Sequence, residues 1–240
     1  MNKAPTLEEQ RQKTPRVVEI IGPAGAGKTT LYKALGNYPD RFRLSGFPDV
    51  RKKADTPFFF WYGLELIPSL LRISRRDSRP LNRREFAWLS ILKGWPSVLQ
   101  GKKQNGSQVI ILDQGPIYLM AEMREFGPEF LKREAAEKFW HEIHCRWAAA
   151  LDTIVCLDTA DKYLLERIQT RTKGHIVKNE PEALVYDFLG RYRRTYDYLI
   201  ASLENCPGGP RVLRFDTKQY QPGDIAELLL IELGHSLPIK

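Results

Sequence analysis

Five short apolar runs alternate along the chain with longer segments that carry apolar residues at helical spacing. The runs cover residues 17–21, 42–47, 109–112, 153–157 and 212–215, and the second is the weakest because Arg43 interrupts it. Nearly continuous apolar runs are typical of parallel strands that are buried on both faces of a sheet. The alternation therefore predicts an α/β fold in which helices cover both sides of a five-stranded parallel sheet.

The segments between these runs predict helices. Pro128 stands where a first helical turn is expected, and Gly36 stands where a helix would stop. Residues 48–107 are more than a plain crossover requires, so we expect an inserted helical pair there, near the acceptor site. Residues 1–15 are polar and predict a flexible lead-in to a single domain spanning 1–240. The helices are predicted over residues 28–36, 57–76, 83–100, 128–150, 161–172, 181–204 and 223–234.

Composition limits the class of protein. Apolar residues make up 42% of the chain and charged residues 28%, which is typical of a globular domain with a sizeable core. No stretch reaches the roughly 20 apolar residues that a membrane span needs, and the N-terminus lacks the apolar run of a secretion signal. We therefore expect a cytoplasmic protein without a transmembrane segment.

The net charge and the cysteines say less about the class of protein. The net charge of +8 suits nucleic acid, anionic lipid or a small ligand rich in phosphate, and it does not choose among them. The three cysteines, Cys145, Cys156 and Cys206, have no paired spacing. They predict reduced structural thiols and no metal-ligand cluster.

The strongest motif is the phosphate-binding loop G-x-x-x-x-G-K-[ST] at residues 22–29. A strand precedes it and a helix follows it, which is the context that this motif requires. Its backbone N–H groups can surround a phosphate, Lys28 is expected to reach the β- and γ-phosphates of ATP, and the Thr29 hydroxyl is expected to ligate Mg²⁺. The predicted nucleotide-binding residues are Gly22, Pro23, Ala24, Gly25, Ala26, Gly27, Lys28, Thr29 and Thr30.

Two further strands end in a carboxylate. Asp113 follows the apolar run 109–112, and an acidic residue at the end of the strand beside a phosphate loop holds Mg²⁺ or its water shell. Asp113 is therefore the second predicted metal ligand, with Thr29. Asp158 ends the run 153–157, but the following Thr159 and Asp161 indicate a helix cap instead.

A basic segment follows the fourth strand. Arg167 and Arg171 are four residues apart, so a helix would present both on one face. The helix is expected to break at Gly174, and residues 167–180 could then form a lid that delivers cations to a transferring phosphate. The alternative is a solvated basic face that ends in a loop, in which His175 is an ordinary surface residue.

The order of these motifs resembles a known family. The phosphate loop, Leu112-Asp-Gln-Gly-Pro, Cys156-Leu-Asp-Thr, the tyrosine-rich segment 191–199 and the final strand with Asp216-Thr217 occur in the order seen in the thymidylate kinase and deoxynucleoside kinase group of the nucleoside monophosphate kinase-like superfamily. The resemblance covers most of residues 16–234 except 50–105. It implies a three-layer fold with strand order 2-3-1-4-5, lid arginines at 167 and 171, and adenine packing around residues 217–220.

The chain departs from this family at two positions. Gln114 follows Asp113 where the family usually has arginine, so an arginine expected near the transferred phosphate is missing. The acidic residue that these kinases place after the second strand has its counterpart in Asp49, which we expect to orient or deprotonate the acceptor hydroxyl. The predicted catalytic residues are Lys28, Asp49, Asp113, Arg167 and Arg171.

The inserted segment 48–107 does not identify the molecule that accepts the phosphate. The aromatic cluster 56–63 fits a pocket wall, a buried helix or the face of a homodimer. The basic residues between 72 and 84 fit a solvated helix end, a phosphorylated acceptor, an RNA terminus or a membrane surface.

The sequence therefore predicts an ATP- and Mg²⁺-dependent kinase of a small acceptor, a nucleoside or nucleotide before others. The alternatives are a kinase or ATPase acting on nucleic-acid ends, a kinase of a sugar or lipid-linked acceptor, and a nucleotide-binding module without catalysis. A guanine-nucleotide switch is disfavoured, because the nearest string to Asn-Lys-x-Asp is Thr217-Lys-Gln-Tyr.

Overall fold

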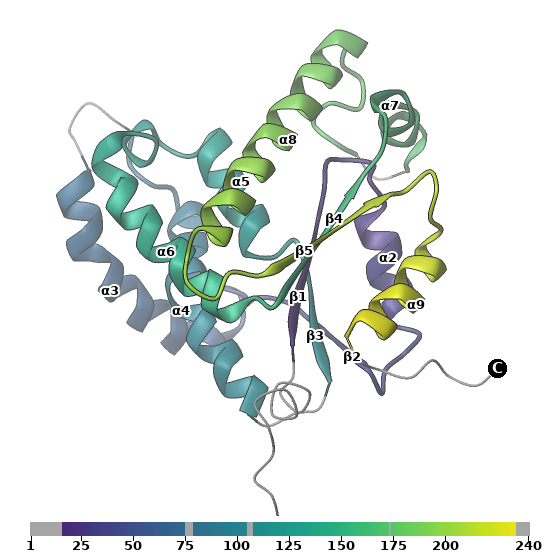
Figure 1. Ribbon diagram of the computed structural model, residues 1–240. Helices are drawn as coiled ribbons and strands as arrows, with labels where there is room; N and C mark the ends of the chain where they lie inside the picture. Colours follow the sequence, from purple (N-terminus) through teal and green to yellow (C-terminus); the bar gives the residue numbers. More distant parts are fainter. Residues whose placement is uncertain (1–15, 75–78, 105–107, 173, 234–240) are drawn as a thin grey trace, which may run out of the picture.

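The computed structural model describes residues 16–74, 79–104, 108–172 and 174–233. Five strands form one sheet in the order β2-β3-β1-β4-β5, and every neighbouring pair is parallel (Figure 1). This confirms the strand order that the family resemblance implied. The strands are β1 (Val17–Ile21), β2 (Phe42–Ser45), β3 (Val109–Asp113), β4 (Thr153–Asp158) and β5 (Arg211–Asp216).

Helices cover both faces of the sheet, which confirms the three-layer architecture. In Figure 1, α2 (Lys28–Leu35) and α9 (Pro222–Glu232) lie on one face. The other face carries α4 (Arg83–Gln104), α5 (Pro116–Phe126), α6 (Glu137–Ala150) and α8 (Glu182–Glu204). The helix α3 (Thr56–Ile73) packs outside α4, and α7 (Asp161–Thr170) lies beside α8.

The central strand positions the phosphate loop. All five residues of β1 are buried, and β1 pairs with β3 on one side and with β4 on the other. Its last residues lie beside Asp113 of β3 and Cys156 of β4. The loop that leaves β1 therefore begins at the point where the carboxyl ends of three parallel strands meet, which is where α/β sheets bind their ligands.

Two helix predictions need correction. The predicted helix 128–150 begins only at Glu137, because the chain before it forms two 3₁₀ turns at Glu129–Leu131 and Glu134–Ala136. Buried Phe130 and Leu131 hold this segment, and the Leu131 carbonyl accepts a hydrogen bond of 2.6 Å from Trp140 Nε1. Helix α5 was not predicted at all, although Pro116 after Gly115 is a usual first helical position.

The segment 48–107 contains two helices, α3 and α4, that pack against each other. Phe58 of α3 packs against Tyr62 and Trp95, whereas Phe60 and Trp61 remain exposed to solvent. The aromatic cluster is therefore partly packed against α4 and partly on the surface. In the described part of the chain, no helix is long and apolar enough to cross a membrane.

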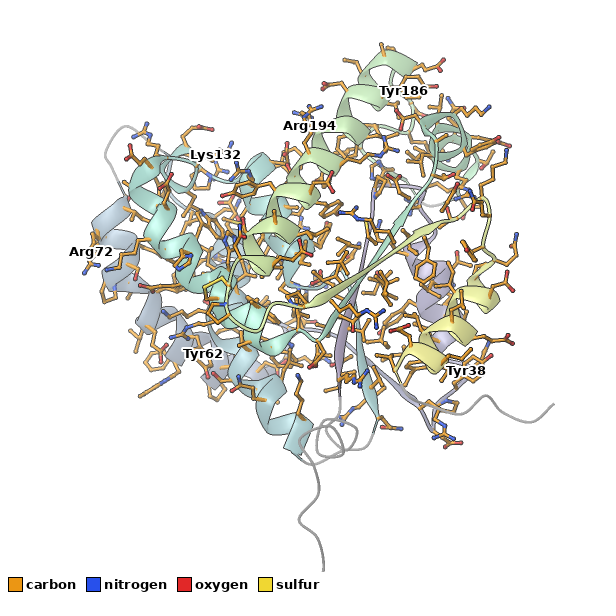
Figure 2. All side chains as sticks on the ribbon, in the orientation of Figure 1. Tyr38, Tyr62, Arg72, Lys132, Tyr186 and Arg194 are labelled. Atoms are coloured by element: carbon orange, nitrogen blue, oxygen red, sulfur yellow. A yellow bond between two sulfur atoms is a disulfide. The ribbon has the colours of Figure 1, made fainter. Side chains whose placement is uncertain are left out.

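The cysteine prediction was wrong for two of the three residues. Cys145 of α6 and Cys206, just after α8, form a disulfide, which Figure 2 draws as a yellow bond. They are 61 residues apart in sequence, and the pairing becomes visible only when α6 and α8 lie side by side. Cys156 of β4 is a free buried thiol, as expected.

A buried carboxyl fixes the start of α5. Glu19 of β1 is fully buried, and its side-chain oxygens accept hydrogen bonds from Ile117 N at 3.0 Å and Tyr118 N at 3.2 Å. Burial raises the pKa of Glu19 to about 8, against the lowering effect of these two N–H donors, and the neighbouring charge of Asp113 raises it further. Gly115 packs so closely that a Cβ on it would lie 2.5 Å from Glu19 Cδ.

This close approach predicts a steric effect at Gly115. Gly115→Ala should lower the free energy of unfolding by about 1–3 kcal/mol, because the added methyl must displace the buried Glu19 carboxyl or the start of α5. The matched control is Gly101→Ala in α4, where a Cβ meets nothing within 4 Å. This control should be neutral or stabilising by about 0.5–1 kcal/mol. Urea denaturation measures both, and equal midpoints for the two variants would contradict the assignment.

Candidate active site

The phosphate loop is held against the neighbouring strand at Gly22. Its φ angle of 145° is in the region that favours glycine, and a Cβ there would lie 2.1 Å from the carbonyl oxygen of Leu157 in β4. Only glycine allows the loop to turn this close to the β4 backbone. The loop then runs directly into α2, whose first turn contains no acidic residue. Its N-terminus therefore offers free N–H groups and partial positive charge to an anion.

Lys28 lies inside the loop that precedes it. Its ammonium donates hydrogen bonds to the carbonyl oxygens of Gly22 at 2.7 Å and Pro23 at 2.9 Å. Burial lowers the pKa of Lys28 to about 8, the nearby charge of Asp113 raises it, and the charge of Arg171 lowers it. The loop thus holds a desolvated cation that a phosphate oxygen would stabilise.

Asp113 and Thr29, the two predicted metal ligands, lie on elements that adjoin Lys28. Asp113 ends β3 next to the end of β1, close enough to Lys28 for their charges to interact. Thr29 is exposed in the first turn of α2. A carboxylate and a hydroxyl are donors of the kind that Mg²⁺ prefers, so the residues present fit this metal. Gln114, next in the chain, has a φ of 55° and is exposed in the same cavity.

The two predicted lid arginines occupy different places. Arg167 donates hydrogen bonds to Gly25 O at 3.3 Å, to Thr217 Oγ1 at 2.8 Å and to Thr217 O at 3.2 Å. It therefore connects α7 to the phosphate loop and to the segment after β5. Arg171 follows α7 and is near enough to Lys28 and His175 to lower the pKa of both.

One cavity of about 740 Å³ joins these elements. Part of its lining comes from the phosphate loop, Arg167, Arg171 and the 217–225 segment, which includes residues 217–220, where the family resemblance placed the adenine. His175 also lines it and packs edge-on against Phe188, so the histidine expected at the surface faces the cavity instead. The part of the lining that α4, α5 and α8 contribute, called the far end below, consists of Arg84, Tyr118, Glu122, Phe126, Phe188, Tyr192 and Tyr196.

Sequence reasoning missed most of this far end. Phe188, Tyr192 and Tyr196 are spaced by four residues on α8 and form a chain of aromatic contacts. Glu122 of α5 accepts a hydrogen bond of 2.5 Å from the Tyr192 hydroxyl, which ties the two walls together. The spacing on α8 is the signal that could have revealed the wall, because residues four apart share one helix face.

Asp158 has a structural partner. Arg193 of α8 forms ion pairs with Asp158 and Asp161, and it also donates to Thr159 O at 2.9 Å. The Asp158 carboxylate further accepts a hydrogen bond of 2.8 Å from Thr159 N. The helix-cap interpretation of this segment was wrong, because the N-cap of α7 is Ala160 and no side chain caps the helix; the Asp158 and Asp161 carboxylates instead pair with Arg193.

Other predicted residues lie outside the cavity lining. Asp49 is half-buried in the loop after β2, where its Oδ1 accepts a hydrogen bond of 2.9 Å from Arg51 N. Neither Asp49 nor the aromatic cluster 56–63 is among the lining residues. In the basic run, Arg79 is paired with Glu85, whereas Arg84 lies over Trp88 and reaches the cavity. Arg75 and Arg76 lie outside the described residues.

No protein-family model matches this sequence, and no curated protein matches it either. Several solved structures do match it. A thymidylate kinase from Candida albicans aligns with a TM-score of 0.52 and 16% identity, over 92% of this chain and 91% of that one. A deoxyadenosine kinase from M. mycoides with bound dATP aligns with a TM-score of 0.48 and 15% identity, over 90% and 98%. The YorR protein from Bacillus subtilis, in complex with phosphorylated GDP, has a TM-score of 0.47 and 15% identity, over 90% and 96%.

The likeness to the thymidylate kinase extends over nearly the whole of both chains, and at 16% identity it defines the fold. The protein has the nucleoside and nucleotide kinase-like P-loop fold, with its sheet order and flanking helices.

The lowered pKa of Lys28 predicts that nucleotide affinity depends on pH. The protonated ammonium is the form that binds a polyphosphate, so ATP affinity should be highest below pH about 8 and fall as the pH rises through the pKa of Lys28. The loss can reach about tenfold per pH unit, because one proton is linked to binding. Isothermal titration without metal measures it. Lys28→Met should bind more weakly with a flatter profile, and a wild-type profile that is equally flat would contradict the role of this proton.

Proposed function

We propose that this protein transfers the γ-phosphoryl group of ATP to a small acceptor, a nucleoside or a nucleotide. The observation that carries the proposal is that one cavity is lined both by an intact phosphate loop and by a group of aromatic side chains. A donor and an acceptor bound at its two ends would meet at the loop, and holding two reactants together is a large part of phosphoryl-transfer catalysis.

The donor end suits ATP in three respects. The N–H groups of the loop and the start of α2 would surround the β- and γ-phosphates, and Lys28 would turn from the Gly22 and Pro23 carbonyls to a phosphate oxygen. Thr29 and Asp113 would hold Mg²⁺, which neutralises charge on the phosphates when bound. Arg167 with Thr217, and Tyr220 beyond them, would form the platform for the adenine.

Catalysis would come from charge and position rather than from a covalent intermediate. The transferred phosphoryl group carries its negative charge on three outer oxygens, and cations fixed around it stabilise the transition state. Lys28 and Arg171 both line the cavity, and they lie near enough for their charges to interact. Gln114 replaces the arginine that the family places after the acidic residue, so the amide of Gln114 would donate a neutral hydrogen bond there.

The acceptor end supports a flat ligand with hydroxyl groups. Tyr118, Phe126 and Phe188 offer aromatic surfaces on which a base can stack, and the Glu122 carboxylate can accept hydrogen bonds from a sugar. A cavity of about 740 Å³ is within the usual range of sites for small molecules, about 300–1,000 Å³. This favours a nucleoside or nucleotide over a nucleic-acid end. A phosphorylated sugar is the second candidate, because the exposed Arg84 at this end could bind its phosphate.

An acceptor screen tests the proposal. Purified protein with ATP and Mg²⁺ should phosphorylate one member of a panel of nucleosides, nucleoside monophosphates, sugars, sugar phosphates and RNA or DNA ends, detected by mass spectrometry of the product. Lys28→Ala should lower transfer by at least about 10²-fold, because transition-state charge loses a fixed cation. An unchanged circular dichroism spectrum would show that the fold remains. Turnover of Lys28→Ala within a few-fold of wild type, or transfer to polymer ends alone, would contradict the proposal.

Two carboxylates have separable roles in this proposal. Asp49 would orient or deprotonate the acceptor hydroxyl, since it follows β2 on the same edge of the sheet where β3 ends in Asp113. Because Asp49 lies outside the cavity lining, this role requires the loop after β2 to bring its carboxylate to the bound acceptor. Glu122 would bind the acceptor, since it lines the cavity.

The two variants should therefore change different kinetic constants of the reaction. Asp49→Asn should lower kcat by about 10²-fold or more with ATP affinity unchanged, because a general base contributes about 10²–10⁴-fold. Glu122→Gln should mainly raise the acceptor KM. Steady-state kinetics with varied acceptor measures both. Normal kcat and KM in Asp49→Asn would remove Asp49 from the site, and a loss of kcat in Glu122→Gln alone would transfer the base role to Glu122.

A further inference from the structure

Three metal-ligating side chains converge on the side of the molecule formed by α6 and the end of α8. His141 and Cys145 are one helical turn apart on α6, with 3.6 Å between His141 Nε2 and Cys145 Sγ. Cys206 reaches them from the turn after α8, where it forms the disulfide with Cys145. One ligand atom from each of the three lies within 4.8 Å of the others.

We propose that the reduced form of this cluster is a zinc site, and that the disulfide is its oxidised, metal-free form. Two thiolates and one imidazole are the donor set that Zn²⁺ takes in proteins, with a fourth position left for water. The histidine indicates a metal site rather than a disulfide alone, because a bridge between two cysteines does not require an imidazole beside its sulfur. Spacing of four residues on a helix also places two ligands on one face, as in other helical zinc sites.

The backbone around the three ligands is already fixed. Cys206 N donates to Leu203 O at 3.1 Å, and Cys206 O accepts from Gly209 N at 3.1 Å, so a tight turn holds this residue. Helix α6 is anchored by the buried Trp147, whose Nε1 donates to Leu92 O at 2.9 Å. The two cysteine Cα atoms are 5.1 Å apart. Ligands on rigid elements lose little freedom when a metal binds.

The chemistry balances with a dithiol or phosphine as the reductant. Two electrons and two protons convert the disulfide into two thiols, and the reductant is oxidised. Binding of Zn²⁺ then releases two protons as both thiols become thiolates, while the neutral imidazole donates its lone pair. His141 is exposed and Cys145 half-buried, so the metal and the reductant can approach from their side, although Cys206 itself is buried. Cys156 is far less suited to bind a metal ion, because burial raises the pKa of its thiol to about 11.

Metal titration of the reduced protein tests the proposal without any measurement of enzyme activity. Full-length protein is reduced with a phosphine, desalted without oxygen, checked for three free thiols, and titrated with Co²⁺ and then Zn²⁺. We expect thiolate-to-cobalt charge-transfer absorption that one equivalent of Zn²⁺ removes. The oxidised protein should show neither signal.

Three variants make the test specific. Cys206→Ser and His141→Ala should each weaken Zn²⁺ binding by at least about tenfold, the lower end of what even the hydrogen-bond partners of metal ligands contribute. Cys156→Ala, which removes the cysteine outside the cluster, should bind Zn²⁺ as the wild type does. Circular dichroism confirms that each variant is folded. Equal Zn²⁺ affinity in wild type and Cys206→Ser, an unaffected His141→Ala, or a disulfide that excess phosphine fails to open in the folded protein would overturn the proposal.

Discussion

The close contact between the phosphate loop and the end of β4 is the constraint on which the site depends. Gly22 lies against the Leu157 carbonyl with no room for a side chain, and this fixes where the loop turns toward α2. The direction of α2 follows, and with it the position of its free N–H groups. Because β4 then leads into α7, the same contact also determines where Arg167 meets Gly25. The donor end is thus assembled around one backbone approach.

The proposed acceptor end is assembled differently. Its walls are α5 and α8, joined by the hydrogen bond between Tyr192 and Glu122 and by a second, of 2.5 Å, from Thr195 to Glu125. The buried Glu19 carboxyl links this end to the sheet, because it holds the first turn of α5 from inside β1. Arg193 provides the corresponding link from α8 to Asp158 and Asp161. Buried or half-buried charged groups therefore connect the two ends of the cavity to the same central strands.

The sequence was a good guide to the sheet and a poor one to the far wall of the cavity. Strands buried on both faces leave a continuous apolar signature, and the phosphate loop has a fixed spacing, so both were predictable from local pattern. Helix α5 was missed because its apolar residues follow a short turn without a separate run of their own. Residues 129–136 were predicted to be helical because Pro128 stands at a usual first helical position, but Pro128 precedes a 3₁₀ turn instead. The disulfide and the placement of Tyr192 near Glu122 depend on which helices become neighbours, and no local pattern encodes this.

The hydrogen bond between Tyr192 and Glu122 has a consequence for how the ligand preference of the cavity can change in evolution. The groups proposed to hold the triphosphate come from backbone and from residues close to the central strands, whereas the proposed acceptor wall consists mainly of side chains on the helices α5 and α8. A substitution on α5 or α8 can alter which molecule fits without moving the phosphate loop. If the proposed function holds, the acceptor could therefore change through substitutions on these two helices alone, while the phosphate loop and the sheet stay as they are.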